Sequence, residues 1–290
     1  MTIVDTHNHL YFPGFKASFD QILKAARDAG VEQQVLIGID ELSCQAALNL
    51  ATKHNVFKVA LGLHPCDVDQ LGVYNADHHK YLGLDSELRP QIYNRTLYFK
   101  WLDDLATQFP DLVVAFGETG FDQFHRQSSA LLQSQSICFK EHLKLCLKHQ
   151  KTLIIHSRGA RNETLKFLEE HAEEFKQINF VWHCFSEDLE AAQRVIELGG
   201  YLGVGGVFTY PKSEDLRAIL KKITLEKLLT ETDSPFLIPH EARKQKAKLN
   251  NPSFLPEIIE TITQTKELPR EIVEAQLYSN AQQAFPGLTS

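Results

Sequence analysis

Histidine and carboxylate side chains recur along the chain in short polar groups, each placed directly after an apolar run. Imidazoles and carboxylates are common ligands of divalent cations, and histidine also moves protons near neutral pH. Six groups stand out: Asp5-Thr-His7-Asn-His9, Gly62-Leu-His64-Pro65, Gly117-Glu118-Thr-Gly120, His156-Ser-Arg158, His183-Cys-Phe-Ser186 and Glu231-Thr-Asp233-Ser-Pro235. These residue types predict metal or acid–base chemistry, provided that the fold brings the groups together.

Each group taken alone also has a structural explanation. His7 and His9 are two residues apart, so on a strand both imidazoles lie on one side and within reach of one cation. The two histidines could equally be surface or core residues. Glu118 could form an ion pair or cap a helix, and Asp233 could cap a turn. The coincidence of all six groups at strand ends favours a site.

The elements that must position these groups follow from the apolar runs. Short β-branched runs at residues 3–4, 35–39, 58–63, 112–116, 152–155, 179–182, 201–204 and 227–229 predict eight buried strands. Helical spacing recurs between most of them, at residues 18–29, 43–53, 134–148, 160–171, 188–198 and 213–222. We therefore predict a single (β/α)8 barrel over residues 1–290, with a two-domain doubly wound protein as the alternative. No linker or internal repeat divides the chain, which favours one domain.

A barrel of this kind would place all six groups around one mouth, because the C-terminal ends of its strands open on the same face. Two connections are long enough to overhang that mouth. One is a predicted insertion at residues 66–96, which carries Asp77, His78 and His79, and the other spans residues 238–256. Long loops in compact barrels are usually functional or mobile.

Composition limits the class of protein. The 290 residues include 30 Lys and Arg against 37 Asp and Glu, a formal charge of −7, and 43% of them are hydrophobic. This composition excludes a disordered chain and a surface that is basic throughout, so any phosphate site must be local. Five scattered cysteines without a Cys-x-x-Cys pair, and no signal sequence, predict a cytoplasmic protein. We expect a monomer.

The combined motifs resemble the TatD-type metal-dependent hydrolases, a branch related to the amidohydrolase barrels, over nearly the whole chain. The resemblance extends beyond the six groups to Asp122, Ala160, Gly199-Gly-Tyr-x-Gly203 and the closing Asn280-Ala-x-x-x-Phe285. It implies a (β/α)8 barrel that binds two, sometimes more, divalent cations at its mouth. It also implies deoxyribonuclease activity, notably exonuclease activity.

The same resemblance implies which residues hold the cations. One cation would be bound by His7, His9, Glu118 and Asp233, and a second by Glu118, His156 and His183. A bridging Glu118 would lower the repulsion between two cations held about 3.5–4 Å apart. Four imidazoles favour zinc or manganese, whereas the family nucleases are described with magnesium, so Mg, Mn and Zn all stay open.

The implied reaction is in-line hydrolysis of a phosphodiester by a water that the two cations activate. Asp233 would orient or deprotonate that water, beside the bridging Glu118. His64 would contact the phosphate or protonate the leaving oxygen, with packing at the rim as the alternative. Arg158 would bind a phosphate through two hydrogen bonds, or instead form a salt bridge at the rim. Residues 203–206 would cradle a phosphate or serve close backbone packing.

The chain departs from the family pattern in two places. Gly120-Phe121-Asp122-Gln123-Phe124 lacks the usual tyrosine after the aspartate, and Asn250-Asn251-Pro252-Ser253 lacks the usual arginine, for which Lys248 is a candidate substitute. The insertion is also longer than the family pattern suggests. These departures bear on substrate more than on metal binding.

Three functions compete on this basis. The first is a nuclease acting on DNA ends, which a charge of −7 permits because only a few phosphates must be bound. The second is a deacylase or amidohydrolase acting on acylated tRNA or a small ester or amide. The third is a barrel retained as a binding scaffold, which would bind metal poorly.

Overall fold

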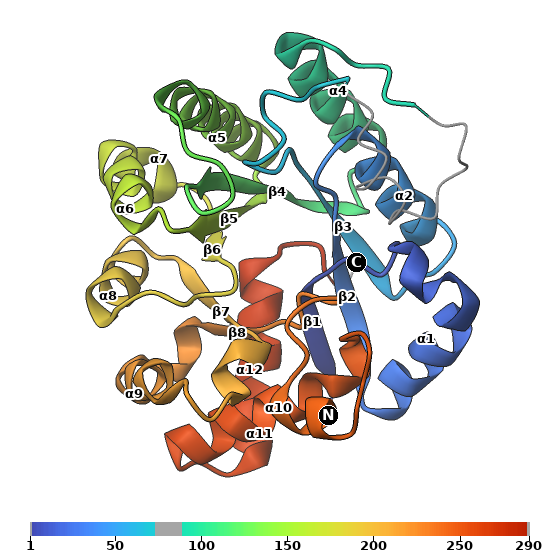
Figure 1. Ribbon diagram of the computed structural model, residues 1–290, viewed down its shortest axis with the longest axis vertical. Helices are drawn as coiled ribbons and strands as arrows, with labels where there is room; N and C mark the ends of the chain where they lie inside the picture. Colours follow the sequence, from blue (N-terminus) through green and yellow to red (C-terminus); the bar gives the residue numbers. More distant parts are fainter. Residues whose placement is uncertain (1, 73–88, 289–290) are drawn as a thin grey trace.

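All eight strands form one sheet in a computed structural model that describes residues 2–72 and 89–288. The sheet is parallel throughout, and its strands follow the order of the sequence. Their bounds are β1 Ile3–Asn8, β2 Val31–Ile37, β3 Phe57–Leu61, β4 Val113–Asp122, β5 Thr152–Arg158, β6 Phe180–Trp182, β7 Tyr201–Val204 and β8 Leu228–Thr230. Figure 1 shows the strands at the centre, surrounded by helices. The predicted barrel is confirmed.

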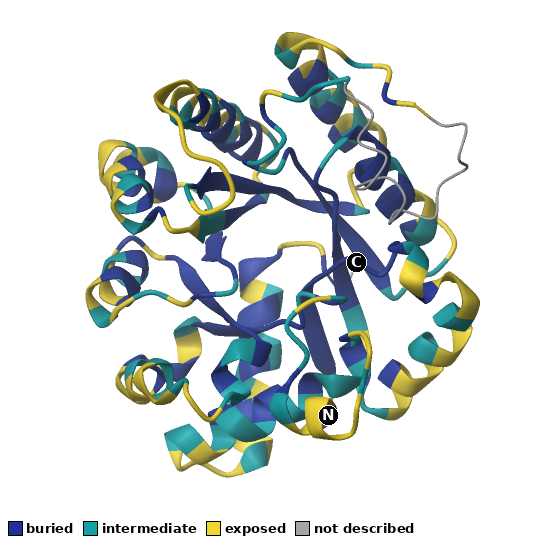
Figure 2. Ribbon diagram, viewed as in Figure 1, coloured by how far each residue is buried: buried dark blue, intermediate teal, exposed yellow. Residues whose placement is uncertain are grey.

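The helices that connect the strands form the outer layer. They are α1 Phe19–Asp28, α2 Glu41–Ala51, α4 Arg95–Gln108, α5 Ser129–His149, α6 Arg161–Glu170, α7 Ala172–Phe175, α8 Leu189–Glu197, α9 Glu214–Lys222, α10 His240–Lys244, α11 Leu255–Lys266 and α12 Arg270–Ala284. Short 3-10 helices lie at η1 Pro13–Ser18, η2 Gly206–Thr209, η3 Leu225–Lys227 and η4 Pro252–Phe254. In Figure 2 the strands are mostly buried, apart from the start of β2 and the end of β5, while the helices expose their outer faces. Among the described residues, no helix has the length and apolar character needed to cross a bilayer.

The barrel closes where the segment after β8 meets β1. The Asp233 amide donates to the His7 carbonyl at 2.9 Å, and the His9 amide donates to the Ser234 carbonyl at 2.8 Å. Below these bonds, the Asp5 carboxylate accepts from the amide and hydroxyl of Thr232 at 3.0 and 2.6 Å. Closure therefore links residues of the first and last polar groups directly.

A buried cluster inside the barrel sets which way the site residues point. It contains Val4, Val35, Ala60, Val114, Ile154, Val181 and Leu229, and it is covered by Ala281, Ala284 and Phe285 from α12 and the residue after it. Because strand side chains alternate between faces, His156 lies on the same face as Ile154, and His183 continues the face of Val181. The Thr152 hydroxyl, at the start of β5, donates to the Ala284 carbonyl, so α12 lies at the opposite end from the mouth.

The two long connections differ in how far the structure describes them. Within the predicted insertion, residues 73–88, including Asp77, His78 and His79, lie outside the described residues. After them α4 begins at Arg95, with Asn94 as its N-cap. In the second connection Asn250 is fully buried, and its amide donates to the Thr232 carbonyl at 2.7 Å. That bond holds the segment after β8 over the mouth.

His142 on α5 supports the end of β3 from behind, and it gives the fold a pH dependence. Its Nε2 accepts from the Leu63 amide at 3.1 Å, and its Nδ1 donates to the Cys138 carbonyl at 2.8 Å. Burial lowers the pKa of His142 from 6.5 to about 4, so the unfolded chain binds this proton more readily than the folded one. The free energy of unfolding should therefore fall by about 1.4 kcal/mol per pH unit between pH 6.5 and 4 from this group.

Thermal unfolding across that pH range tests the role of His142. We expect the unfolding temperature of the wild-type chain to drop more steeply toward pH 5 than that of a His142→Gln variant, whose amide does not titrate. His171, which is only partly buried, provides a matched comparison through His171→Gln. Parallel slopes for wild type and His142→Gln would assign the acid sensitivity to other groups.

Candidate metal centre

The first and last polar groups meet at the mouth of the barrel. His7 Nε2 and His9 Nε2 lie 3.6 and 3.4 Å from Asp233 Oδ1. The other nitrogen of His9, Nδ1, lies 3.0 Å from the Ile37 carbonyl and 2.8 Å from the Tyr11 hydroxyl, which fixes the ring with Nε2 toward Asp233. A hydrogen bond of this kind is typical of histidines that bind metal.

Glu118 lies at the centre of the site. Its Oε2 is 2.7 Å from His183 Nε2, 3.5 Å from His156 Nδ1 and 3.8 Å from His7 Nε2. Its Oε1 is 3.9 Å from His64 Nε2. The six residues predicted to hold two cations are thus brought together. The Glu118 carboxylate lies between those predicted for the first cation and those predicted for the second.

Several polar atoms of this cluster are buried without a hydrogen-bond partner. Both ring nitrogens of His7 and Nδ1 of His183 are in this state, and the buried Oε2 of Glu118 meets the His183 imidazole at 2.7 Å. His7 and Glu118 are only 1% and 5% exposed. Leaving such groups unpaired is costly, and a bound cation would compensate them. The donor set, with imidazole nitrogens around carboxylate oxygens, therefore fits a divalent cation.

Protonation of the cluster agrees with that fit. Burial lowers the pKa of His7 well below its usual range, with His183 adding to the effect, and burial lowers the pKa of His64 to about 3. Burial alone would raise the pKa of Glu118, but the His183 charge and the hydrogen bonds and charges of the neighbouring imidazoles together hold that pKa well below its usual range. Conversely, Glu118 raises the pKa of His183 above its usual range despite burial. His7 and His64 are thus neutral, so neither ring repels a cation bound beside it.

His64 lies nearer to the cluster than the sequence suggested. It was predicted to contact the substrate, without a metal role. Its Nδ1 accepts from the Cys66 amide at 3.1 Å, which leaves Nε2 facing Glu118. The ligand atoms of His64, Glu118 and His156 all lie within 4.8 Å of one another. Because Nδ1 accepts, the proton of neutral His64 lies on Nε2, which suits a hydrogen bond to substrate, whereas binding a cation through Nε2 would require the other tautomer.

Three buried carboxylates that the sequence analysis left without a role support the cluster. Asp122 Oδ2 lies 3.1 Å from His156 Nε2, and Glu231 Oε1 lies 3.7 Å from His183 Nδ1. Asp5 Oδ1 accepts from the His7 amide at 3.3 Å. Each of these carboxylates lies in the same motif as a candidate ligand. Asp5 precedes His7 by two residues, and Glu231 precedes Asp233 by two, a spacing from which the sequence alone could have indicated their supporting role. Such outer carboxylates orient imidazoles and raise their basicity.

Close packing explains the glycines after β7. A Cβ on Gly203 would lie 2.4 Å from Glu231 Oε2, and one on Gly206 would lie 2.0 Å from the Leu237 carbonyl oxygen. Of the two sequence interpretations of residues 203–206, the contacts support close packing around Glu231.

Arg158, at the end of β5, lies with its guanidinium carbon 4.3 Å from the ring centre of Phe124, so it forms a cation–π contact at the rim.

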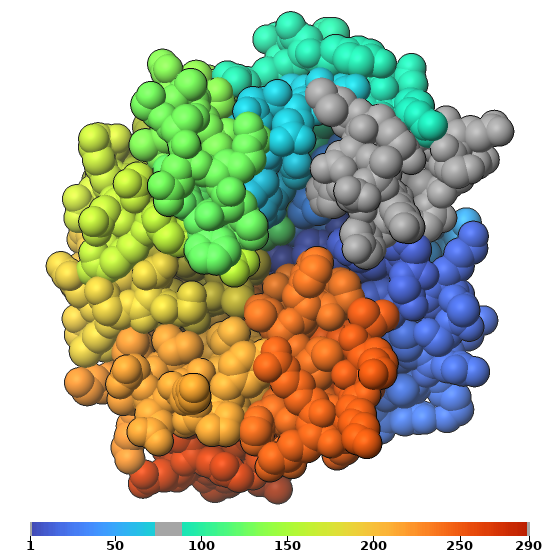
Figure 3. All heavy atoms as spheres, in the orientation of Figure 1, coloured from blue at the N-terminus to red at the C-terminus, as the bar shows by residue number. Residues whose placement is uncertain are grey.

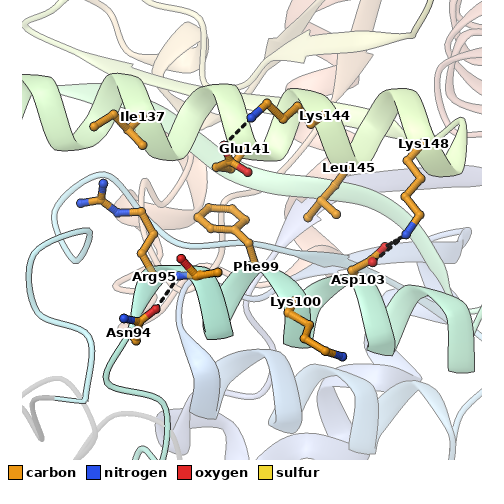
Figure 4. Close-up of a pocket in the computed structure, with 11 residues that line it drawn as sticks. Asn94, Arg95, Phe99, Lys100, Asp103, Ile137, Glu141, Lys144, Leu145 and Lys148 are labelled. Atoms are coloured by element: carbon orange, nitrogen blue, oxygen red, sulfur yellow. Dashed lines mark hydrogen bonds and ion pairs between the residues drawn. The ribbon is translucent and has the colours of Figure 1, made fainter.

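The face that carries the cluster is hollowed, as Figure 3 shows between the green segment after β4 and the orange segment after β8. A different groove, of about 580 Å³, lies between α4 and α5 on the outside of the barrel (Figure 4). Its charges are partly paired, Lys144 with Glu141 and Lys148 with Asp103. Among the described residues, none of the predicted site residues lines this groove.

Comparison with known proteins agrees with the geometry. Residues 4–286 match the family model described as TatD related DNase. The chain is 26% identical to the uncharacterized metal-dependent hydrolase YabD of Bacillus subtilis, over 98% of each chain. It is 32% identical to the deoxyribonuclease Tat-D of Schizosaccharomyces pombe, over 75% of this chain and 64% of that protein.

A solved structure shares both the fold and part of the sequence. The TatD homologue YjjV of Escherichia coli superposes with a TM-score of 0.81 at 26% identity, covering 98% of this chain and 97% of that one. Together with the family match over nearly the whole length, this likeness settles the family. The chain belongs to the TatD family of metal-dependent hydrolases.

Proposed function

We propose that this protein is a deoxyribonuclease that removes nucleotides from DNA ends, with two divalent cations held by His7, His9, Glu118, His156, His183 and Asp233. The observation that carries the proposal is Glu118, whose buried Oε2 lies among imidazole nitrogens of His7, His156 and His183 at 3.8, 3.5 and 2.7 Å. The deoxyribonuclease name of the fission yeast relative supports the substrate class. Cations bound there would supply charge neutralisation for a phosphate and would acidify a water.

The chain's own residues supply the rest of the reaction. Asp233 faces His7 and His9 and is partly exposed, so it is placed to orient an attacking water and take its proton. His64 is neutral, and its Nε2 faces the cluster, where it is positioned to donate to a phosphate oxygen or the leaving oxygen. Arg158, beside the same mouth, can bind a neighbouring phosphate.

Two exposed phenylalanines beside the cluster favour a nucleic acid over a small ester. Phe236 is 49% exposed, and its ring centre lies 6.2 Å from that of His9. Phe124 is 64% exposed and carries the Arg158 guanidinium on its face. Nucleobases stack on exposed aromatic rings of this kind, whereas a small ester has no ring to stack on them.

Replacement of Phe236 tests the substrate class. Loss of one stacked base costs about 1–3 kcal/mol, so Phe236→Ala should raise KM for a short oligonucleotide about tenfold or more. Hydrolysis of a small activated phosphodiester should be unchanged, because it offers no base to stack. Ile272→Ala, which removes an exposed apolar side chain on α12, is the control.

A panel of substrates separates this proposal from its competitors. DNA oligonucleotides labelled at either end, acylated tRNA and small esters would be offered under magnesium, manganese and zinc. Shortening of the oligonucleotides from one end is the expected result. Cleavage of acylated tRNA or esters, with intact DNA under every metal, would contradict the proposal.

A further inference from the structure

A second group of ligand-type side chains lies at the rim, outside the six residues discussed above. Cys66 follows β3, Asp122 ends β4, and His125 lies in the loop after β4. One ligand atom from each lies within 4.8 Å of the other two. Cys66 Sγ is 3.9 Å from His125 Nδ1, which in turn is 2.7 Å from Asp122 Oδ2.

The two loops that carry this group are fastened to each other. The Arg126 guanidinium donates to both carboxylate oxygens of Asp69 at 2.8 and 2.6 Å and to the Cys66 carbonyl at 3.2 Å. The Gln135 amide donates to the Asp122 carbonyl and to the carbonyl just before Cys66, both at 3.1 Å. The thiol, carboxylate and imidazole are thus held near one another before any ligand arrives, which lowers the ordering cost of binding one.

The ligand chemistry differs from that of the main cluster. A thiolate, an imidazole and a carboxylate together suit zinc, which takes three protein ligands and leaves a fourth position open. The main cluster, in contrast, offers only nitrogen and oxygen atoms. Asp122 is fully buried while His125 is exposed, so the group has a buried anchor and a side open to solvent.

We propose that Cys66, Asp122 and His125 form an auxiliary site for a thiophilic divalent cation such as zinc. On binding, the Cys66 Sγ proton passes to solvent, and the proton of His125 Nδ1 moves by exchange with solvent to Nε2, so that the hydrogen bond to Asp122 gives way to coordination through Nδ1. Asp122 Oδ2 also lies 3.1 Å from His156 Nε2. The Asp122 carboxylate would therefore contact both the auxiliary cation and His156, and so connect the rim to the main cluster.

Cobalt(II) binding tests this site without reference to nuclease activity. A thiolate bound to cobalt gives a strong charge-transfer absorption in the near ultraviolet, and the main cluster has no sulfur to produce one. We expect this absorption in the wild-type protein, its loss in Cys66→Ser, and its weakening in His125→Ala. Bound zinc should fall by one equivalent per chain in Cys66→Ser.

Cys184→Ser is the matched control, because Cys184 follows His183 and is the other cysteine that is not fully buried. It should keep the absorption. Absence of the band from the wild-type protein, its persistence in Cys66→Ser, or its loss in Cys184→Ser alone would each overturn the proposal. A protein that cleaves no DNA but shows the band would contradict the nuclease proposal and leave the auxiliary site supported.

Discussion

Replacing Glu118 with Gln should lower the rate of oligonucleotide hydrolysis by about 10³-fold or more, the scale seen when a central electrostatic group is removed from an active site. Glu118 contacts residues predicted for both cations, with its Oε2 at 2.7 Å from His183 Nε2 and 3.8 Å from His7 Nε2. An amide carries no charge to bridge two cations. Metal analysis of the variant should accordingly show reduced occupancy, measured beside single-turnover cleavage of an end-labelled oligonucleotide.

The control is Glu170→Gln on α6, an exposed carboxylate paired only with Lys166 at 3.7 Å among the interactions described. It removes the same charge far from the mouth and should leave the rate unchanged. Far-ultraviolet circular dichroism and thermal unfolding of both variants establish that the barrel is intact. A folded Glu118→Gln protein with the wild-type rate would rule out the two-cation account.

Withdrawal of divalent cations should abolish hydrolysis and also destabilise the fold. A ligand that binds only the folded state, at a concentration 100 times its Kd, adds about 2.7 kcal/mol to the free energy of unfolding. For a chain of this size, that corresponds to a rise in Tm of about 4–5 °C on adding back zinc or manganese. Differential scanning calorimetry with and without a chelator measures this shift.

The unpaired ring nitrogens of His7 and His183 give the physical reason for the expected stabilisation, since a cation satisfies groups that the fold leaves unpaired. Glu118→Gln should therefore show a much smaller rise in Tm than the wild-type protein. A retained binding scaffold without metal function would instead show the same Tm in chelator and in metal. Restoration of activity by one metal and of Tm by several would identify the ion that supports turnover.

Residue types at strand ends predicted most of the site, because a parallel barrel converts sequence order into spatial convergence. His156 and His183 lie two residues beyond Ile154 and Val181, and that alternation was readable in advance. The barrel, the family and the grouping of the six candidate ligands all followed. The number and identity of the cations did not, since nitrogen and oxygen ligands suit several ions.

Other features depend on contacts between distant residues, which no local pattern reveals. Strand β4 was predicted to end at Phe116, whereas it continues to Asp122, so Glu118 lies within the strand and not after it. Glycines at positions 117 and 120 interrupt the apolar pattern and conceal this extension. Likewise, the sequence does not reveal that Cys66 and Asp122 lie close together, because 56 residues separate them.

Helix α4 was also missed within the long connection before β4. Its residues from Arg95 to Gln108 include buried Tyr98, Phe99 and Leu102, yet polar neighbours weaken the helical period. The Tyr98 hydroxyl donates to the Gly62 carbonyl at 2.7 Å, a contact that fixes the end of β3 from outside. Packing on the barrel, and not local propensity, accounts for this helix.

The bonds that join β1 to the segment after β8 have a consequence for synthesis of the protein. Asp5 and Thr232 are 227 residues apart, and His7 meets Asp233 through the adjacent backbone bond. Translation produces one half of this pair at the start and the other near the end, so a nascent chain cannot assemble the cluster until the eighth strand has left the ribosome. The proposed cluster is therefore complete only in the finished barrel, and cation binding there would require every earlier strand to be in place.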